Sequence, residues 1–324
     1  MGLVSEVQLD QWARLNPRDA QTLTAELVRN LASASVPRAT TLRFPIGDGV
    51  NQPGPDGVVE TALGLPPFIP DGKSVWEIGS GDHPRDKATS DYAALTAAVP
   101  EGERLQSTFV FVTPRSATSG WGHTWKEEQQ QAWLQERKNR GEWLDVRVID
   151  ATQLEHWLSY FPAVDDWLAR FIGVAAGNFD TATQRWGTLR TIGEPPPLQP
   201  SVLLVNRDDA RKGVEDAVAG DLTWLQLDTH LPNQVGDFVS ACIAAMDDDD
   251  RVGVASRTII VGDAEAWRTF VNLREAHVLV ADFDLATDDS HNLRLRETAR
   301  RANHIVILAG PPGCVPNPSR VALP

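Results

Sequence analysis

The sequence predicts an α/β protein with two domains. Three observations support this prediction: the length, the order of helical and strand-like patterns, and a proline-rich stretch. The chain has 324 residues, of which 42% are apolar; at about 100–200 residues per domain this is enough for two hydrophobic cores. Periodic patterns lie on both sides of EPPPLQP at 194–200, where proline disfavours helices and sheet ladders. We therefore expect domains at 1–173 and 201–324, joined by a proline-rich linker at 174–200.

The first half is expected to begin with one helix over 10–35, because Leu23, Leu27 and Leu31 recur every four residues. Short β-branched or alternating runs, separated by Gly and Pro turns, then predict strands, and longer polar stretches predict helices. The expected elements after the first helix are strands at 41–46, 58–63 and 74–78, a helix at 84–97, a strand at 108–112, a helix at 125–140, a strand at 145–149, and final helices carrying Trp157 and Trp167.

In the second half, strand-like runs alternate strictly with helical stretches. This alternation is typical of a parallel sheet covered on both faces. No G-x-x-x-x-G-K-[ST] sequence occurs, so the loop that holds nucleotide phosphates is missing and we do not expect ATP hydrolysis. The stretch from Pro311 has no periodic pattern, which fits either a natural tail or a chain with further domains. The expected strands are 202–205, 222–227, 257–261, 277–281 and 305–308.

Charge and cysteine content restrict the class of protein. With 30 basic and 44 acidic residues the formal net charge is −14, so any contact with nucleic acid must be local. Cys242 and Cys314 cannot build a disulfide framework or a paired-cysteine zinc site, and a cytoplasmic location is expected. No signal peptide and no apolar stretch of membrane-spanning length is present, so we expect no membrane partner.

Two carboxylates stand near the ends of two successive predicted strands. Asp56 lies at the mouth of one strand, and Glu77, between Trp76 and Ile78, near the end of the next. A buried carboxylate in an apolar strand is costly without a cation, and two acids at one sheet edge form the oxygen-rich site that Mg²⁺ prefers. Such an ion serves phosphodiester hydrolysis, with Lys87 as the candidate ammonium that stabilises developing charge.

These residues carry a family resemblance. The element order, the Pro55-Asp56 pair and Glu77 resemble the PD-(D/E)xK restriction-endonuclease superfamily. The phrases PGPDGVVE, GKSVWEIGSGDHPRDKATSDY, STFVFVTPR, GEWLDVRVIDATQLEHWL and FPAVDDWLARFIG resemble, over about residues 20–173, the N-terminal nuclease-like domain of large bacterial proteins associated with phage defence. The resemblance implies an N-terminal αβββαβ restriction-endonuclease-like domain.

The resemblance also implies site residues. Asp56 and Glu77 would bind Mg²⁺ or Mn²⁺, and Glu26 on the opening helix resembles a further acid. The usual lysine two positions after the acid is replaced by Gly79; some members of the superfamily supply it from the following helix, where Lys87 lies. The second half more loosely resembles a degenerate P-loop region, which implies a regulatory, scaffold or oligomerisation role.

Structural explanations remain open for each residue. Asp56 in Pro-Asp-Gly also fits an ordinary β-turn, Glu60 a solvent-facing strand position, and Lys87 a helix-surface pair with Asp91. Five cations are candidates for local contact with DNA, although basic residues at a helix C-terminus also complement its dipole; they are Arg115, Lys126, Arg137, Lys138 and Arg140.

The sequence therefore favours a metal-dependent DNA endonuclease that acts as an effector in anti-phage defence, although the proposed chemistry would serve RNA as well. The alternative is a nuclease fold that has lost catalysis, as Gly79 suggests, and that binds or senses DNA or a phage protein. The oligomeric state stays open, with a homo-oligomer as one expectation.

Overall fold

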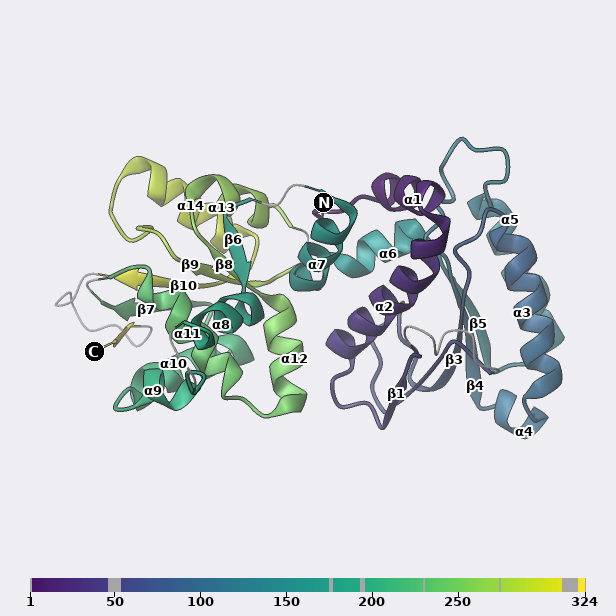
Figure 1. Cartoon of the computed structure of the whole chain (residues 1–324), viewed down its shortest axis with the longest axis horizontal. Coiled ribbons are helices and arrows are strands. Elements are labelled where there is room, and N and C mark those ends of the chain that lie inside the picture. Colours follow the sequence, from purple (N-terminus) through teal and green to yellow (C-terminus); the bar gives the residue numbers. More distant parts are fainter. Residues whose placement is uncertain are drawn as a thin grey trace. The chain divides into compact units, whose positions relative to one another are not determined.

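The computed structural model describes residues 2–45, 54–174, 177–192, 196–229, 231–273, 275–310 and 320–323 (Figure 1). The chain divides into two compact units. The N-terminal unit comprises Gly2–Leu158 with Phe171–Val174, and the C-terminal unit comprises Ser159–Arg170 with Ala175–Pro324. The fold is mixed α/β, with one sheet in each unit. No described helix is long and apolar enough to cross a membrane.

The N-terminal unit contains a five-stranded sheet in the order β1-β2-β3-β4-β5. The pairs β1–β2 and β2–β3 are antiparallel, whereas β3–β4 and β4–β5 are parallel. Its elements are α1 (Glu6–Leu15), α2 (Pro17–Ser35), β1 (Thr41–Arg43), β2 (Gly57–Thr61), β3 (Gly72–Ile78), α3 (Pro84–Ala98), α4 (Glu101–Arg104), β4 (Ser107–Val112), α5 (Glu127–Arg140), β5 (Asp145–Ile149) and α6 (Ala151–Leu158).

The single opening helix expected over 10–35 is wrong. The chain forms two helices that meet at Asn16, because Pro17 has no N–H to donate and occupies the first turn of α2. Ile46, the end of the expected first strand, lies outside the described residues, and β1 ends at Arg43.

Two helical layers cover the sheet of the N-terminal unit, with α3 and α5 on one side and α1, α2 and α6 on the other (Figure 1). Alternation along β3 divides its side chains between these layers. Trp76 packs on Trp157 of α6, whereas Val75 joins the core formed by Phe109, Phe111 and helix α3. Glu77, two residues from Val75, therefore lies on the α3 side.

The C-terminal unit has a six-stranded sheet in the order β11-β7-β10-β9-β8-β6. All its pairs are parallel except β6–β8 at one edge, so the expectation of an all-parallel sheet is wrong at that edge. Its elements are α7 (Pro162–Ile172), which ends in the other unit, β6 (Phe179–Thr181), α8 (Ala182–Arg190), α9 (Pro200–Leu204), α10 (Asp208–Ala219), β7 (Trp224–Asp228), α11 (Gln234–Ala244), α12 (Asp248–Arg257), β8 (Thr258–Val261), α13 (Ala264–Phe270), β9 (Val278–Ala281), α14 (Ser290–Arg301), β10 (Ile305–Gly310) and β11 (Arg320–Ala322).

Two further expectations for this half are wrong, and one strand was not anticipated. The expected linker contains β6 and α8, and α8 begins with a capping box in which Thr181 and Gln184 satisfy each other's backbone N–H groups. The expected strand 202–205 lies in α9, which Pro200 starts; a short apolar run does not distinguish helix from strand. The aperiodic end contains β11, paired with β7.

Candidate active site

Asp56 and Glu77 meet at one end of the β2–β3 pair. Gly57 pairs with Trp76 in the antiparallel register, so the next position places Asp56 opposite Glu77, with both side chains on the same face. The Ile78 N–H donates to Asp56 Oδ2 at 2.8 Å, which fixes the Asp56 carboxylate against β3. A side-chain hydrogen bond also joins the Asp56 and Glu77 carboxyl groups.

Glu77 is 7% exposed. Burial, followed by repulsion from Asp56 and Asp91, raises the pKa of Glu77 to about 9, while the charge of Lys87 acts in the opposite direction. At neutral pH the Asp56–Glu77 pair therefore keeps a proton that a free glutamic acid would release. The single ammonium group of Lys87 stands beside three acidic side chains, those of Asp56, Glu77 and Asp91.

The alkyl chain of Lys87 packs over Gly79. A Cβ atom at Gly79 would lie 2.6 Å from Phe111 Cζ and 2.9 Å from Lys87 Cγ, so the alkyl chain of Lys87 takes the place of a side chain at position 79. Lys87 Nζ lies 2.7 Å from Asp91 Oδ1. Burial lowers and the contact with Asp91 raises the pKa of Lys87, with a net upward shift to which Glu77 and Asp56 also contribute.

Asp91 joins this site, although sequence reasoning placed it on the helix surface. It is 9% exposed, and its Oδ2 atom has no hydrogen-bond partner. Burial raises the pKa of Asp91, as does Asp56, against the opposing contact with Lys87. One signal could have revealed it: Asp91 is adjacent to Tyr92 and one turn after Ala88 and Lys87, and Ala88 and Tyr92 are both core residues.

The structure does not bring Glu26 to this pair. Glu26 is half-buried on α2, in the layer that covers the other side of the sheet, and the charges that act on Glu77 are those of Asp56, Asp91 and Lys87. Glu60 is exposed on β2, as the solvent-facing interpretation predicts.

Two of the expected DNA-binding cations are buried structural residues. Arg115 is 3% exposed; it pairs with Asp82 at 3.1 Å and donates to the Gly81 carbonyl. Arg137 is 6% exposed and lies 4.2 Å from the centre of the Trp133 ring. Both guanidinium groups are buried and already have partners within the protein, which disfavours the expected contact with DNA.

The other three expected cations are closer to solvent. Lys138 pairs with Asp145 at 2.8 Å, and Arg140 pairs with Glu136 at 2.5 Å. Lys126 is exposed just before α5 and has no ion pair within the described part of the chain. Of the expected nucleic-acid contacts, Lys126 is therefore the one that the fold leaves most available.

A second group of carboxylates lies in the C-terminal unit: Asp282 follows β9, Asp237 lies in α11 and Asp180 lies in β6. Arg185 of α8 contacts all three members: Nη2 is 2.9 Å from Asp282 Oδ2, Nε is 2.5 Å from Asp237 Oδ1, and Nη1 is 3.4 Å from Asp180 Oδ2. The Gly236 N–H also donates to Asp282 Oδ1 at 3.3 Å. This group, unlike the first, has a cation that reaches each carboxylate.

Within the described ranges there is no group of three or more His, Cys, Asp or Glu side chains arranged to hold a metal ion. No protein-family model, curated protein or solved structure matches the chain. A functional assignment therefore depends on the geometry and charge of the Asp56–Glu77 pair and its neighbours.

Proposed function

We propose that the N-terminal unit is a metal-dependent nuclease that hydrolyses phosphodiester bonds, with DNA as the first substrate to test and anti-phage defence as its role. The observation that carries this proposal is the meeting of Asp56 and Glu77 beside an ammonium group whose alkyl chain covers Gly79. The sequence resemblance to PD-(D/E)xK nucleases agrees with this arrangement, and Lys87 would take the role of the lysine missing at residue 79.

The residues present fit a divalent cation. Asp56 and Glu77 are carboxylates held against each other, and the buried Asp91 Oδ2 atom has no partner. Mg²⁺ commonly uses only one or two protein carboxylates and completes its shell with water and substrate phosphate, so a third protein ligand is not required. When bound, the ion would supply Lewis-acid polarisation of the phosphodiester and a more acidic water.

Each side chain then has a distinct task. Asp56 and Glu77 would hold the ion, and the backbone N–H of Ile78 keeps Asp56 oriented. Lys87 would stabilise negative charge that develops on the phosphate or on the attacking water. Asp91, through its 2.7 Å contact with Lys87 Nζ, would hold that ammonium group in position. The C-terminal unit would act as a regulatory region.

Plasmid cleavage in Mg²⁺ or Mn²⁺ tests the proposal. We expect Asp56→Asn and Glu77→Gln to lower the cleavage rate by about 100-fold or more, and Lys87→Met to lower it by a similar factor, because each removes a charge that acts in the transition state. Glu60→Gln is the matched control, since Glu60 is exposed on β2, the strand that Asp56 precedes; we expect it to cleave at the unmodified rate.

Cleavage that survives both Asp56→Asn and Glu77→Gln would refute the proposed site. Absence of cleavage by the unmodified protein, together with salt-sensitive DNA binding, would instead support the binding module that Gly79 suggests. Circular dichroism of each variant separates loss of the site from loss of the fold.

A further inference from the structure

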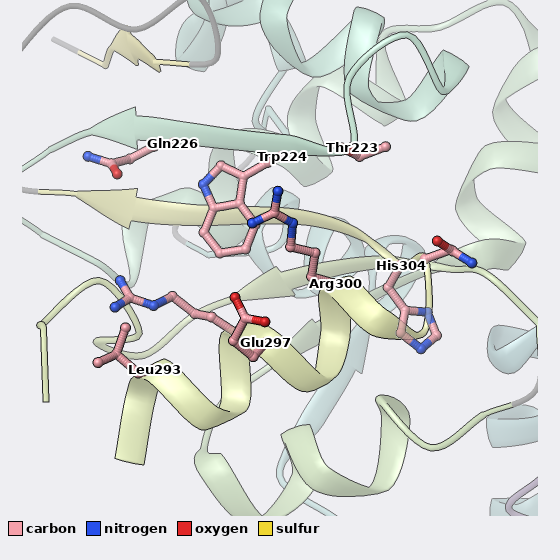
Figure 2. Close-up of a pocket in the computed structure, with 9 residues that line it drawn as sticks. Thr223, Trp224, Gln226, Leu293, Glu297, Arg300 and His304 are labelled. Atoms are coloured by element: carbon pink, nitrogen blue, oxygen red, sulfur yellow. The ribbon is translucent and has the colours of Figure 1, made fainter. Parts of the chain in front are cut away.

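One half of a sheet face in the C-terminal unit is left open beside α14. Leu225 and Leu227 of β7 join the core shared with α10 and α11, so Trp224 and Gln226 point to the opposite face. On that face α14 packs against the neighbouring strand β10 through its buried side. Between α14 and β7 lies a cavity of about 600 Å³. Figure 2 shows the Trp224 ring facing the side chains of α14.

The lining of this cavity combines an aromatic ring, the cations Arg296 and Arg300, and one acid, Glu297. Trp224 is half-buried, and Arg296 and Arg300 lie one helical turn apart on α14, on the same side of that helix. Arg296 donates to the Ala286 carbonyl at 3.0 Å and pairs with Asp288, which holds it in place. Arg300 is exposed, and no hydrogen bond or ion pair of its guanidinium group is found among the described residues.

Acidic residues outnumber basic ones by 44 to 30 in this chain, and the guanidinium group of Arg300 has no ion pair among the described residues. A guanidinium group recognises phosphate or carboxylate through two parallel hydrogen bonds, and an indole face stacks on planar rings. Gln226 and Asn303, also at the cavity, carry amide groups that can both donate and accept hydrogen bonds. The volume lies within the range of about 300–1,000 Å³ for small-molecule sites.

We propose that this groove binds a mononucleotide, with its base against Trp224 and its phosphate on Arg300. The shared chemistry is a planar aromatic ring joined to an anion, and the nucleotide adds hydrogen-bonding edges that match the amide groups of the lining. The groove lies at the start of β7, whereas the Arg185 group lies at the opposite ends of the strands. The proposal stands independently of nuclease activity in the N-terminal unit.

Isothermal titration of the full chain with AMP, GMP, CMP and UMP tests this site, with adenosine and inorganic phosphate as partial ligands. We expect at least one mononucleotide to bind, and each partial ligand to bind more weakly. Arg300→Gln and Trp224→Leu should each weaken binding about tenfold or more, which corresponds to about 1.4 kcal/mol. Arg301→Gln is the matched control because Arg301 is the next exposed arginine of α14 and does not line the cavity.

Three results would overturn the proposal. The first is no binding of any mononucleotide at millimolar concentration, and the second is equal weakening by Arg301→Gln and Arg300→Gln. The third is Arg300-dependent binding of a single-stranded oligonucleotide without binding of mononucleotides, which would assign the groove to nucleic acid. If Trp224→Leu does not fold by circular dichroism, Arg300→Gln alone decides, since its side chain is exposed.

Discussion

Both units gather three carboxylates and one basic side chain near the ends of sheet strands, but they balance the charge differently. In the C-terminal unit the Arg185 guanidinium contacts Asp180, Asp237 and Asp282. In the N-terminal unit the Lys87 ammonium has its hydrogen bond with Asp91, and Asp56 and Glu77 are left facing each other. A guanidinium group presents a fork of donors, whereas an ammonium group is a compact point charge.

This difference indicates which of the two groups of carboxylates has its charge balanced by a basic side chain of the protein itself. Arg185 reaches every carboxylate around it, so the C-terminal group needs no added cation. Glu77 is buried and Asp56 half-buried, and neither has an ion pair among the described residues; a functional site commonly retains such a costly arrangement. We therefore infer that the N-terminal group is built to receive a divalent cation and the C-terminal group is a structural network.

Removal of Arg185 should have the largest effect on stability. Arg185→Met leaves Asp282, whose side chain is 9% exposed, without its counter-charge. Because the Arg185 side chain is 23% exposed, we expect a loss at the lower end of the range of about 3–5 kcal/mol for a fully buried pair. Urea unfolding of the full chain, followed by fluorescence, measures this loss. A loss below about 1 kcal/mol would show that the network is not structural. Arg190→Met, an exposed change on the same helix, is the control.

Replacement of Glu77 should instead raise the free energy of unfolding of the metal-free protein. Glu77→Gln keeps the shape of the side chain and removes an acid that must take up a proton on folding at pH 7, because its pKa rises from 4.5 to about 9 in the folded chain. We expect the variant to be more stable than the unmodified chain by about 1–3 kcal/mol at pH 7 in EDTA. A destabilised Glu77→Gln variant would indicate that the carboxyl group is structural, like the acids around Arg185.

Lowering the pH should change the stability of the two units in opposite directions. Burial, followed by the effect of His304, lowers the pKa of His277 to about 3 from 6.5, so the unfolded chain binds a proton that the folded C-terminal unit does not. Its stability is therefore complete above pH 6.5 and is lost as the pH falls toward 3, by up to about 1.4 kcal/mol per pH unit. The pKa of Glu77 is raised from 4.5 to about 9, so its contribution favours the N-terminal unit as the pH falls from 9 toward 4.5.

Urea unfolding at pH 6.5 and 4.5, with hydrogen exchange measured for peptides of each unit, gives the change in the free energy of unfolding with pH for each unit. In a His277→Leu variant we expect the slope of the C-terminal unit to flatten while that of the N-terminal unit is unchanged. An unaltered slope in both units would remove His277 as the source of acid sensitivity.

Lys87→Met should have the smallest effect on stability. The Lys87 side chain is 49% exposed and that of Asp91 is 11% exposed; because water screens the ammonium group and Lys87 contacts one acid where Arg185 contacts three, we expect a loss of about 1 kcal/mol. Thermal unfolding should therefore show a shift of only a few degrees at most. A loss as large as that of Arg185→Met would show that the two basic residues have equivalent structural roles, which contradicts the comparison.

Local patterns predicted the positions of many elements. The strand expected at 145–149 is β5, and the helix expected from Pro84 begins at that residue. The residues Phe179–Arg190 were missed because β6 is only three residues long and is fixed by pairing with β8, far away in the sequence. The Thr181–Gln184 capping box was a local signal of α8.

The candidate site shows the same division between local and tertiary information. The meeting of Asp56 and Glu77 follows from the register of two successive strands, which the sequence pattern could anticipate. The burial of Asp91 depends on how α3 packs against the sheet, and the burial of Arg115 depends on Asp10 and Asp82. A residue's charge type is local information, whereas its burial is a tertiary property.

Binding of Mn²⁺ to the full chain, followed by electron paramagnetic resonance, tests the central comparison most directly. We expect Mn²⁺ to bind to the unmodified protein, to bind at least about tenfold more weakly to Asp56→Asn and Glu77→Gln, and to bind unchanged to Asp237→Asn. Binding that is lost in Asp237→Asn and retained in Asp56→Asn would place the cation in the C-terminal unit and contradict the account.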